Sequence, residues 1–467
     1  MRGWGATPFP GEGGSMAFGA ARDPDLAYRY GRMASLESKA LGFDCVWTPC
    51  VDVNTEPRNP IIGTRAFSDR PELVAEMAVA MVKGMQDVRV IPNAKHFPGH
   101  GDTAFDTHRQ IGVVPHSRER LEAIDFHPYR ELVKAGLRGV ETAHIIYPAL
   151  DDTPSLPATL SRTCIYDLLR KDMGYEGLIV SDSLTMKAIT DHYTVGDAAV
   201  RSFNAGHDIL LHDYNEPPEP TFQAMLEAAK DGTIPMEELD ASAMRVLEHK
   251  EWAGLPARGP ISREEIDAVF GCAEHQALCR EIYDASATVL ENDALPLGQN
   301  GEVCVVATCS EEERKGMADF AATVENSRDV LFRECGERLG TVWTHLIDED
   351  PSSDEVDAAV EECAKAGTVI FATMPRIVSY KELSGRVGGG QVEVVRKLLA
   401  LRKTVVLCVF GTPYVLTDFP KTQGCLTTYS STIAAVEAGV RILFGEAESR
   451  GKLPVELSET YPFGYGL

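Results

Sequence analysis

The sequence lacks the features that mark membrane proteins, disulfide-stabilised proteins and nucleic-acid binders. It contains no run of about eighteen apolar residues and no signal-peptide core at its N-terminus, so we expect no membrane span. Its 11 cysteines form no CxxC pair, which favours free thiols in a reducing cytoplasm. The 467 residues carry 70 Asp and Glu against 45 Lys and Arg, for a formal charge of −25. This charge repels nucleic acids and anionic lipids and argues against a polyanionic partner.

Nucleotide and metal motifs are missing as well. Neither GxxxxGKS/T nor GxGxxG occurs, so no phosphate-binding loop is predicted. His96 and His100 are four residues apart, but the Phe-Pro-Gly between them cannot be helical. The cysteines and carboxylates nearby have no recognisable ligand spacing. We therefore expect neither a metal ion nor a cofactor.

Helical and strand-like segments alternate from residue 21 to about residue 255. Five short, nearly continuous apolar segments are separated by helical periodicity, at 45–53, 88–97, 139–150, 177–184 and 208–213. Short apolar strands between helices are typical of βα units that form a parallel sheet. The sequence therefore predicts an α/β domain over residues 1–257, either a barrel or an open sheet.

A second α/β domain is predicted nearer the C-terminus. Residues 258–298 are interpreted as a linker with a helix, in which the helical run HQALCREIYDASATVLEN ends before ALPLG. Over residues 299–467, four or five strand-like segments alternate with helices. This alternation predicts a three-layer α/β/α sandwich with a parallel sheet.

Polar side chains follow strand after strand in the first domain. The C-terminal edge of a parallel sheet or barrel is where ligands bind, and residue types used in catalysis recur there. These polar residues are Asp52, Asn54, Lys95, His96, His144, Ser181, Asp182, His212 and Asp213.

The segment KHFPGHGDTAFDTH, residues 95–108, is the richest in titratable groups. Asp106 and His108 are two residues apart, so an extended segment places them on one side. A carboxylate bonded to one ring nitrogen orients a histidine for acid/base work near neutral pH. His100 is assigned to loop structure, and FPGHG is predicted to be a hinge-prone connection.

A second carboxylate, Asp182, ends an apolar strand just before a helix. One interpretation is a helix N-cap. The other is a nucleophile that points from the top of the strand into the active face. A nucleophilic carboxylate and a proton donor together are the equipment of double-displacement glycoside hydrolysis.

Several motifs resemble glycoside hydrolase family 3, and in particular its β-N-acetylglucosaminidase branch. The first domain carries KHFPGHGDTAFDTH, NPIIGTRAFSDRP, AHIIYPAL, PATLSR and GLIVSDSLTMKAI, while SATVLENDALPL and GKLPVEL resemble the second domain. The resemblance runs over nearly the whole chain. It implies a TIM-like (β/α)8 barrel followed by the α/β/α sandwich.

The resemblance also implies roles for individual residues. Asp182 falls on the position of the nucleophile, and Asp106 with His108 on an acid/base dyad carried by a mobile loop. The substrate-binding residues implied in the same way are Arg65, Lys95 and His96 for sugar hydroxyls, and His144 and Met186 for the wall of the sugar subsite.

The chain departs from the family at its start. The family begins with two barrel strands, the second of which ends in a D-x-E-G-G motif that binds sugar. Here GATPFPGEGGSMAFGAARDPDLAYRYG resembles the segment that follows this motif, and the five strand-like segments fall short of the eight in a full barrel. Either Met1 is an internal methionine of a longer protein, or a partner chain completes the barrel. We expect the chain as written to be poorly stable or weakly active, since an inner strand edge is exposed.

The leading functional hypothesis is a retaining exo-acting β-N-acetylglucosaminidase. Its substrate is then a small carbohydrate that contains N-acetylglucosamine, from peptidoglycan fragments or chito-oligosaccharides, and a homodimer is left open. Two alternatives stay open: a phosphorylase that uses the same residues, and a degenerate sugar-binding protein without turnover.

Overall fold

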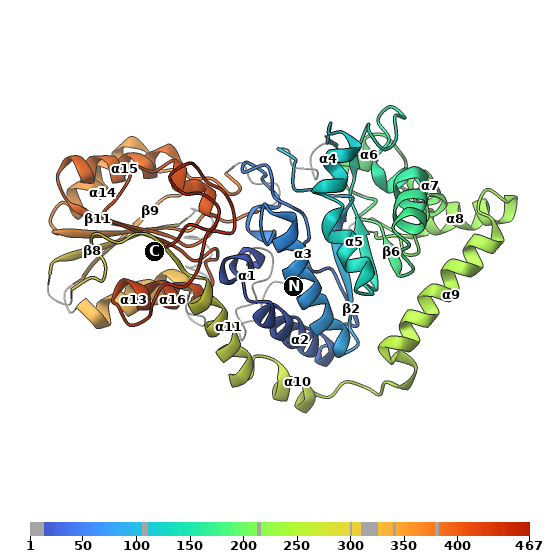
Figure 1. Cartoon of the computed structure of the whole chain (residues 1–467), viewed down its shortest axis with the longest axis horizontal. Helices are drawn as coiled ribbons and strands as arrows, with labels where there is room; N and C mark the ends of the chain where they lie inside the picture. The colour runs from blue at the N-terminus through green and yellow to red at the C-terminus, as the bar shows by residue number, and fades with distance from the viewer. Residues whose placement is uncertain are drawn as a thin grey trace. The chain divides into compact units, whose positions relative to one another are not determined.

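The computed structural model describes residues 14–104, 111–212, 216–298, 301–309, 326–339, 342–378 and 383–467. The chain separates into two compact units (Figure 1). One, here called the barrel unit, consists of Pro24–Ile62 and Ala66–Phe270. The other, the sandwich unit, consists of Gly271–Leu467 with Gly63–Arg65 and the described part of Met1–Asp23.

The barrel unit is built around a parallel sheet. Strands β1 (Cys45–Val46), β2 (Ile91–Phe97), β4 (Gly139–Thr142) and β6 (Leu178–Val180) lie in the order β1-β2-β4-β6. A single parallel bridge between Val180 and Ile209 adds a fifth segment. All five predicted strand-like segments thus take part in one sheet, and the predicted barrel-like α/β arrangement is confirmed.

Helices and short turns alternate with these strands, as the periodicity predicts (Figure 1). The helices of the barrel unit are α2 (Pro24–Ala40), α3 (Pro71–Asp87), α4 (Arg118–Ala123), α5 (His127–Lys134), α6 (Lys187–Thr190), α7 (Val195–Ala205), α8 (Glu219–Asp231), α9 (Met236–Ala253) and α10 (Arg263–Val269). The shorter or irregular elements are η2 (Ala158–Leu160), the π-helical η3 (Thr163–Asp172), η4 (Leu255–Ala257), and the strand pair β3 (Gly112–Val113) and β5 (Ile145–Ile146).

Helices α2 and α3 pack closely because each carries a glycine at the contact. A Cβ on Gly31 would lie 2.2 Å from the Met81 carbonyl oxygen, and one on Gly84 would lie 2.0 Å from the Tyr28 carbonyl oxygen. Only glycine allows the two backbones to approach this far. This close packing fixes the position of α3. The next element in the chain is β2, the strand that carries the first site residues.

The sandwich unit contains a six-stranded sheet. Its order is β7-β12-β11-β10-β8-β9, formed by β7 (Thr288–Glu291), β8 (Val303–Thr308), β9 (Val342–Ile347), β10 (Thr368–Thr373), β11 (Thr404–Val409) and β12 (Gly424–Thr427). Five strands are parallel, while β7 pairs antiparallel with β12. The predicted three-layer sandwich is confirmed, with α14 (Ser353–Cys363) and α15 (Gly389–Ala400) on one face and α13 (Ser327–Leu339) and α16 (Ile433–Leu443) on the other (Figure 1).

Residues 271–298 contribute to this unit rather than only connecting to it. Helix α11 (Ala273–Ser286) packs against α1 (Ser15–Ala21) and α16. It ends at Ser286, and the next residues form strand β7, whereas the sequence analysis continued the helix to residue 292. Thr288 and Val289 are β-branched and lie buried against β12, so tertiary pairing overrides the helical pattern. The turn η5 (Pro413–Thr417) completes the unit.

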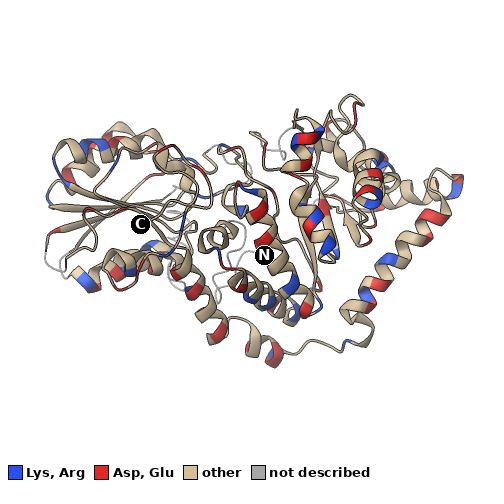
Figure 2. Cartoon of the chain, viewed as in Figure 1, with Lys and Arg blue, Asp and Glu red and all other residues tan. Residues whose placement is uncertain are grey.

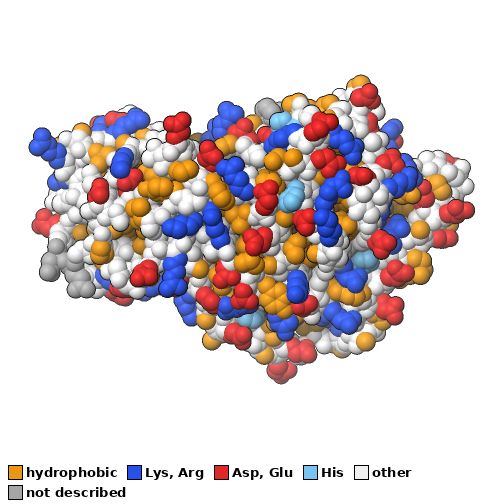
Figure 3. Space-filling view, viewed as in Figure 1, with side chains coloured by type: hydrophobic (Ala, Val, Ile, Leu, Met, Phe, Trp, Pro, Cys, Tyr) orange, Lys and Arg blue, Asp and Glu red, His pale blue; other side chains and the backbone are white. Residues whose placement is uncertain are grey.

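Charged residues are spread over the outer helices rather than gathered by sign. Figure 2 shows Lys and Arg interspersed with Asp and Glu on these helices, and the face in Figure 3 shows the same mixture among apolar side chains. On this face (Figure 3) the two signs of charge are mixed. Among the described residues, no helix has the length and apolar character needed to cross a membrane.

Candidate active site

The C-terminal ends of β2, β4 and β6 bring four ionisable side chains together. One ligand-type atom from each of His96, Glu141 and Asp182 lies within 4.8 Å of the others. The Lys95 ammonium lies 3.5 Å from Glu141 Oε2. Lys95, His96 and Asp182 were predicted from their places at strand ends. The structure shows that they share one cluster, as neighbouring parallel strands require.

Glu141 was missed by the sequence analysis. It lies inside the apolar strand β4, not after its end, and is 3% exposed. A carboxylate buried within an apolar strand is rarely tolerated without a partner, so its presence in GVETAH was the signal that could have found it. Its ion pair with Lys95 supplies that partner.

Asp182 is held in its ionised form. The backbone N–H of Ser183 donates to Asp182 Oδ1 at 2.7 Å. Burial alone would raise the pKa of Asp182, but the charges of His144, His96 and Lys95, together with the hydrogen bond from Ser183, lower this pKa below its ordinary value. Asp182 is therefore an anion at neutral pH, as a nucleophile must be.

His144 follows β4 and uses both ring nitrogens within the protein. Its Nε2 donates to the Ser183 carbonyl oxygen at 2.9 Å, and its Nδ1 lies 2.9 Å from Thr159 Oγ1. The ring thus holds the backbone of the residue next to Asp182. Met186 precedes helix α6 as its N-cap residue and is half-buried. That His144 and Met186 line the sugar subsite stays a prediction.

A chain of hydrogen bonds continues from His144 into the core. Thr159 Oγ1 lies 3.3 Å from Thr142 Oγ1, which lies 2.9 Å from His207 Nε2. His207 Nδ1 donates to the Ser202 carbonyl oxygen at 2.8 Å. With Nδ1 as the donor of a neutral ring, Nε2 accepts from the Thr142 hydroxyl.

The buried His207 makes stability depend on pH. Burial lowers the pKa of His207 from its ordinary 6.5 to about 4. Between these values the unfolded chain binds the extra proton, so stability falls as the pH falls through this window. His207→Gln does not titrate. We expect the wild type to lose about 3 kcal/mol more stability than this variant between pH 7 and pH 4. Urea unfolding at both pH values measures the difference, and parallel losses would contradict it.

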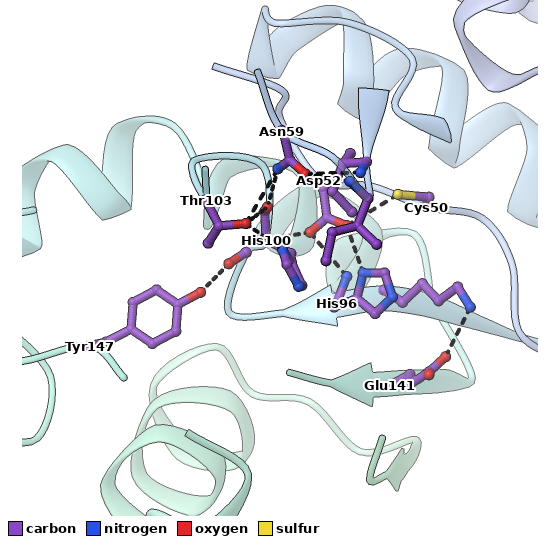
Figure 4. A network of polar contacts seen from close by, with 12 residues as sticks. Cys50, Asp52, Asn59, His96, His100, Thr103, Glu141 and Tyr147 are labelled. Atoms are coloured by element: carbon purple, nitrogen blue, oxygen red, sulfur yellow. Dashed lines mark hydrogen bonds and ion pairs between the residues drawn. The ribbon is translucent and has the colours of Figure 1, made fainter. Parts of the chain in front are cut away.

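Asp52 is the centre of a second polar network beside the cluster (Figure 4). Its Oδ2 accepts from His96 Nδ1 at 2.7 Å and from the Cys50 thiol at 3.1 Å. Its Oδ1 accepts from the backbone N–H of His96 at 3.1 Å and from that of His100 at 2.6 Å. The sequence analysis placed Asp52 at a strand end but gave it no role.

The FPGHG segment is anchored, contrary to the prediction of a hinge-prone connection. All of its residues are buried. Tyr147 donates to the Gly99 carbonyl oxygen, and Asn59 Nδ2 donates to the His100 carbonyl oxygen at 2.8 Å (Figure 4). Thr103 Oγ1 lies 2.8 Å from His100 Nδ1, which agrees with a structural place for this histidine. Tyr147 and Asn59 come from distant segments, which glycine and proline content alone cannot reveal.

Three predicted site residues are not tested by the described structure. Asp106 and His108 lie outside the described residues. Arg65 ends η1 (Gly63–Arg65), which belongs to the sandwich unit. The acid/base dyad and the sugar contact of Arg65 stay predictions.

The cluster could also offer ligands to a cation. His96 belongs to two groups with metal-ligand spacing, one with Glu141 and Asp182 and one with Cys50 and Asp52. In the first group, however, the Lys95 ammonium already lies 3.5 Å from Glu141. A resident divalent ion would have to compete with this charge.

Comparisons with known proteins match one family over both parts of the chain. The glycosyl hydrolase family 3 N-terminal domain matches residues 1–249, more than half of the chain, and the family's C-terminal domain matches residues 287–463. The chain belongs to glycosyl hydrolase family 3.

Two curated relatives and one solved structure of a family 3 enzyme match almost the whole chain. Beta-hexosaminidase A of Pseudoalteromonas piscicida is 29% identical, over 95% of this chain and 79% of the relative. The beta-N-acetylglucosaminidase/beta-glucosidase of Cellulomonas fimi is 28% identical, over 95% and 80%. The structure of a family 3 beta-N-acetylglucosaminidase from Paenibacillus sp. superimposes with a TM-score of 0.83 at 30% identity, over 95% of this chain and 82% of that one.

Proposed function

We propose that this family 3 chain is a retaining exo-acting β-N-acetylglucosaminidase. The observation that carries the proposal is Asp182, an ionised carboxylate at the end of β6 that lies beside His96 and Glu141. The names of the relatives, beta-hexosaminidase and beta-N-acetylglucosaminidase, support the acetamido sugar. The substrates proposed are peptidoglycan fragments or chito-oligosaccharides with a terminal β-linked N-acetylglucosamine.

The proposed reaction has two displacement steps. An Asp182 oxygen attacks the anomeric carbon and forms a glycosyl ester, while the bond to the aglycone oxygen breaks and that oxygen takes a proton from His108. His108 then removes a proton from an incoming water. The hydroxide oxygen bonds to the anomeric carbon, Asp182 leaves as a carboxylate, and the configuration is retained. Asp106 orients His108 and stabilises its charge.

The remaining residues are proposed to bind the sugar. Lys95 and His96 lie beside Asp182 and suit the hydroxyl groups of the same ring, and Arg65 is proposed as a further ligand of these hydroxyls. His144 and Met186 are proposed to line the subsite. Because His144 already holds Ser183, its contact with the sugar is proposed to be through the ring rather than through a free nitrogen.

A covalent trap tests the proposal. A 2-acetamido-5-fluoro glycosyl fluoride should form a stable ester, because the fluorine slows the second step more than loading. We expect a mass increase of one glycosyl group on the peptide that contains Asp182, and no increase in Asp182→Asn. An unlabelled wild type that still binds N-acetylglucosamine would contradict the proposal and favour a sugar-binding protein.

Whether water or phosphate attacks the glycosyl ester in the second step is tested with the same enzyme. Product analysis with and without inorganic phosphate should give free N-acetylglucosamine in both cases. If a glycosyl phosphate were the main product, the protein would be a phosphorylase that uses the same Asp182 and not a hydrolase.

A further inference from the structure

Asp52 itself has no part in the proposed reaction, yet its hydrogen bonds reach the reacting cluster through His96. We infer that Asp52 is a positioning residue, which fixes the ring orientation and the tautomer of His96 beside the nucleophile. Asp52 and His96 then form a second carboxylate–imidazole pair, separate from Asp106 and His108. The inference rests on the proposed function of Asp182.

Burial and hydrogen bonds hold the Asp52 carboxylate in one orientation. Its side chain is fully buried, and its two oxygens accept four hydrogen bonds from Cys50, His96 and His100. Two of these come from His96, one from the ring and one from the backbone. The same carboxylate therefore fixes both the main chain and the side chain of His96 (Figure 4).

The proton on the His96 ring follows from this arrangement. Burial alone would raise the pKa of Asp52, but the charge of His96 and the hydrogen bonds from His96 and Cys50 hold this pKa well below its ordinary value. An ionised carboxylate only accepts hydrogen bonds, so His96 Nδ1 carries a proton. The Nε2 atom is then on the side of the ring away from Asp52.

This arrangement matters for the reaction because His96 lies within the cluster of Glu141 and Asp182. A fixed ring presents Nε2 to the bound sugar or to Asp182 without a rotation on each turnover. Without Asp52 the ring loses both its orientation and its preferred tautomer.

The test compares Asp52→Asn with Cys50→Ser. Asparagine has the same shape but only one oxygen, which the backbone N–H groups of His96 and His100 are expected to hold. Its NH₂ group then faces Nδ1 and cannot accept a proton there, so His96 must change tautomer. We expect kcat to fall at least about 100-fold in Asp52→Asn. Cys50→Ser changes a neighbour of the same carboxylate but keeps a hydrogen-bond donor to Asp52 Oδ2, and we expect its kcat to stay within about 3-fold of the wild type.

Nitrogen-15 NMR of histidine-labelled protein supplies a readout that a merely structural role would not change. The His96 signals are assigned by their loss in His96→Gln. We expect a protonated Nδ1 in the wild type and an unprotonated Nδ1 in Asp52→Asn. A folded Asp52→Asn with wild-type kcat would overturn the inference.

An unprotonated Nδ1 in the wild type would overturn it too, even if Asp52→Asn fails to fold. The NMR measurement needs no turnover. A failure of the covalent trap at Asp182 would refute the proposed function while the state of the His96 ring is judged separately.

Discussion

Turnover is expected to be lost when Asp182 is replaced by asparagine, with kcat about 10⁵-fold lower than in the wild type. Asparagine keeps an oxygen that can accept from the Ser183 N–H, so the loop after β6 should keep its structure. It cannot form the glycosyl ester, because its amide is a poor nucleophile. Steady-state hydrolysis of p-nitrophenyl N-acetylglucosaminide measures the effect.

A matched control lies nine residues further on. Asp191 is an exposed aspartate at the end of α6, and Asp191→Asn should retain kcat within about 2-fold. If Asp182→Asn kept a substantial fraction of the wild-type rate, the nucleophile would have to be another group. Glu141, the other carboxylate of the cluster, would then be the first candidate.

The second large effect is expected for His108→Ala, and it should depend on the leaving group. An unactivated substrate such as chitobiose needs a proton on its leaving oxygen, so kcat/KM should fall about 10³-fold. A dinitrophenyl glycoside leaves without that proton, and its kcat/KM should fall less than about 10-fold. The two substrates are compared on the same enzyme preparation.

Added azide gives a further readout for this variant. It attacks the glycosyl enzyme without a general base, so it should restore turnover of the dinitrophenyl substrate and release a β-glycosyl azide. His192→Gln, a change at an exposed histidine after α6, is the control. Equal losses of kcat/KM for both substrates would show that His108 is not the general acid.

The positions of the main site residues could be predicted because strand ends leave a clear pattern. Asp182 follows the buried apolar strand β6, and Lys95 and His96 lie at the end of β2, with only β4 between these two strands in the sheet. Their meeting in one cluster follows from local sequence plus a general rule on parallel sheets. The family motifs added roles for these residues and left their predicted positions unchanged.

What the sequence did not predict depends on register and on distant partners. Lys95 meets Glu141 because β2 and β4 pair with Ala94 opposite Val140, and no local pattern fixes that register. Three of the four bonds to Asp52 join segments more than forty residues apart. Strand β7 was taken as helix because its pairing with β12 forms across the whole second unit.

The anchored FPGHG segment divides the loop after β2 into parts that can be altered separately. Exchange of residues 104–111 between relatives should leave Asp52, Asn59 and Tyr147 holding the same backbone, so His96 would keep its place. An exchange that begins at residue 98 would replace the backbone that these side chains hold, and would disturb His96 as well. The useful boundary for grafting a new proton donor onto this scaffold is therefore Thr103, not the prolines and glycines that suggest a hinge.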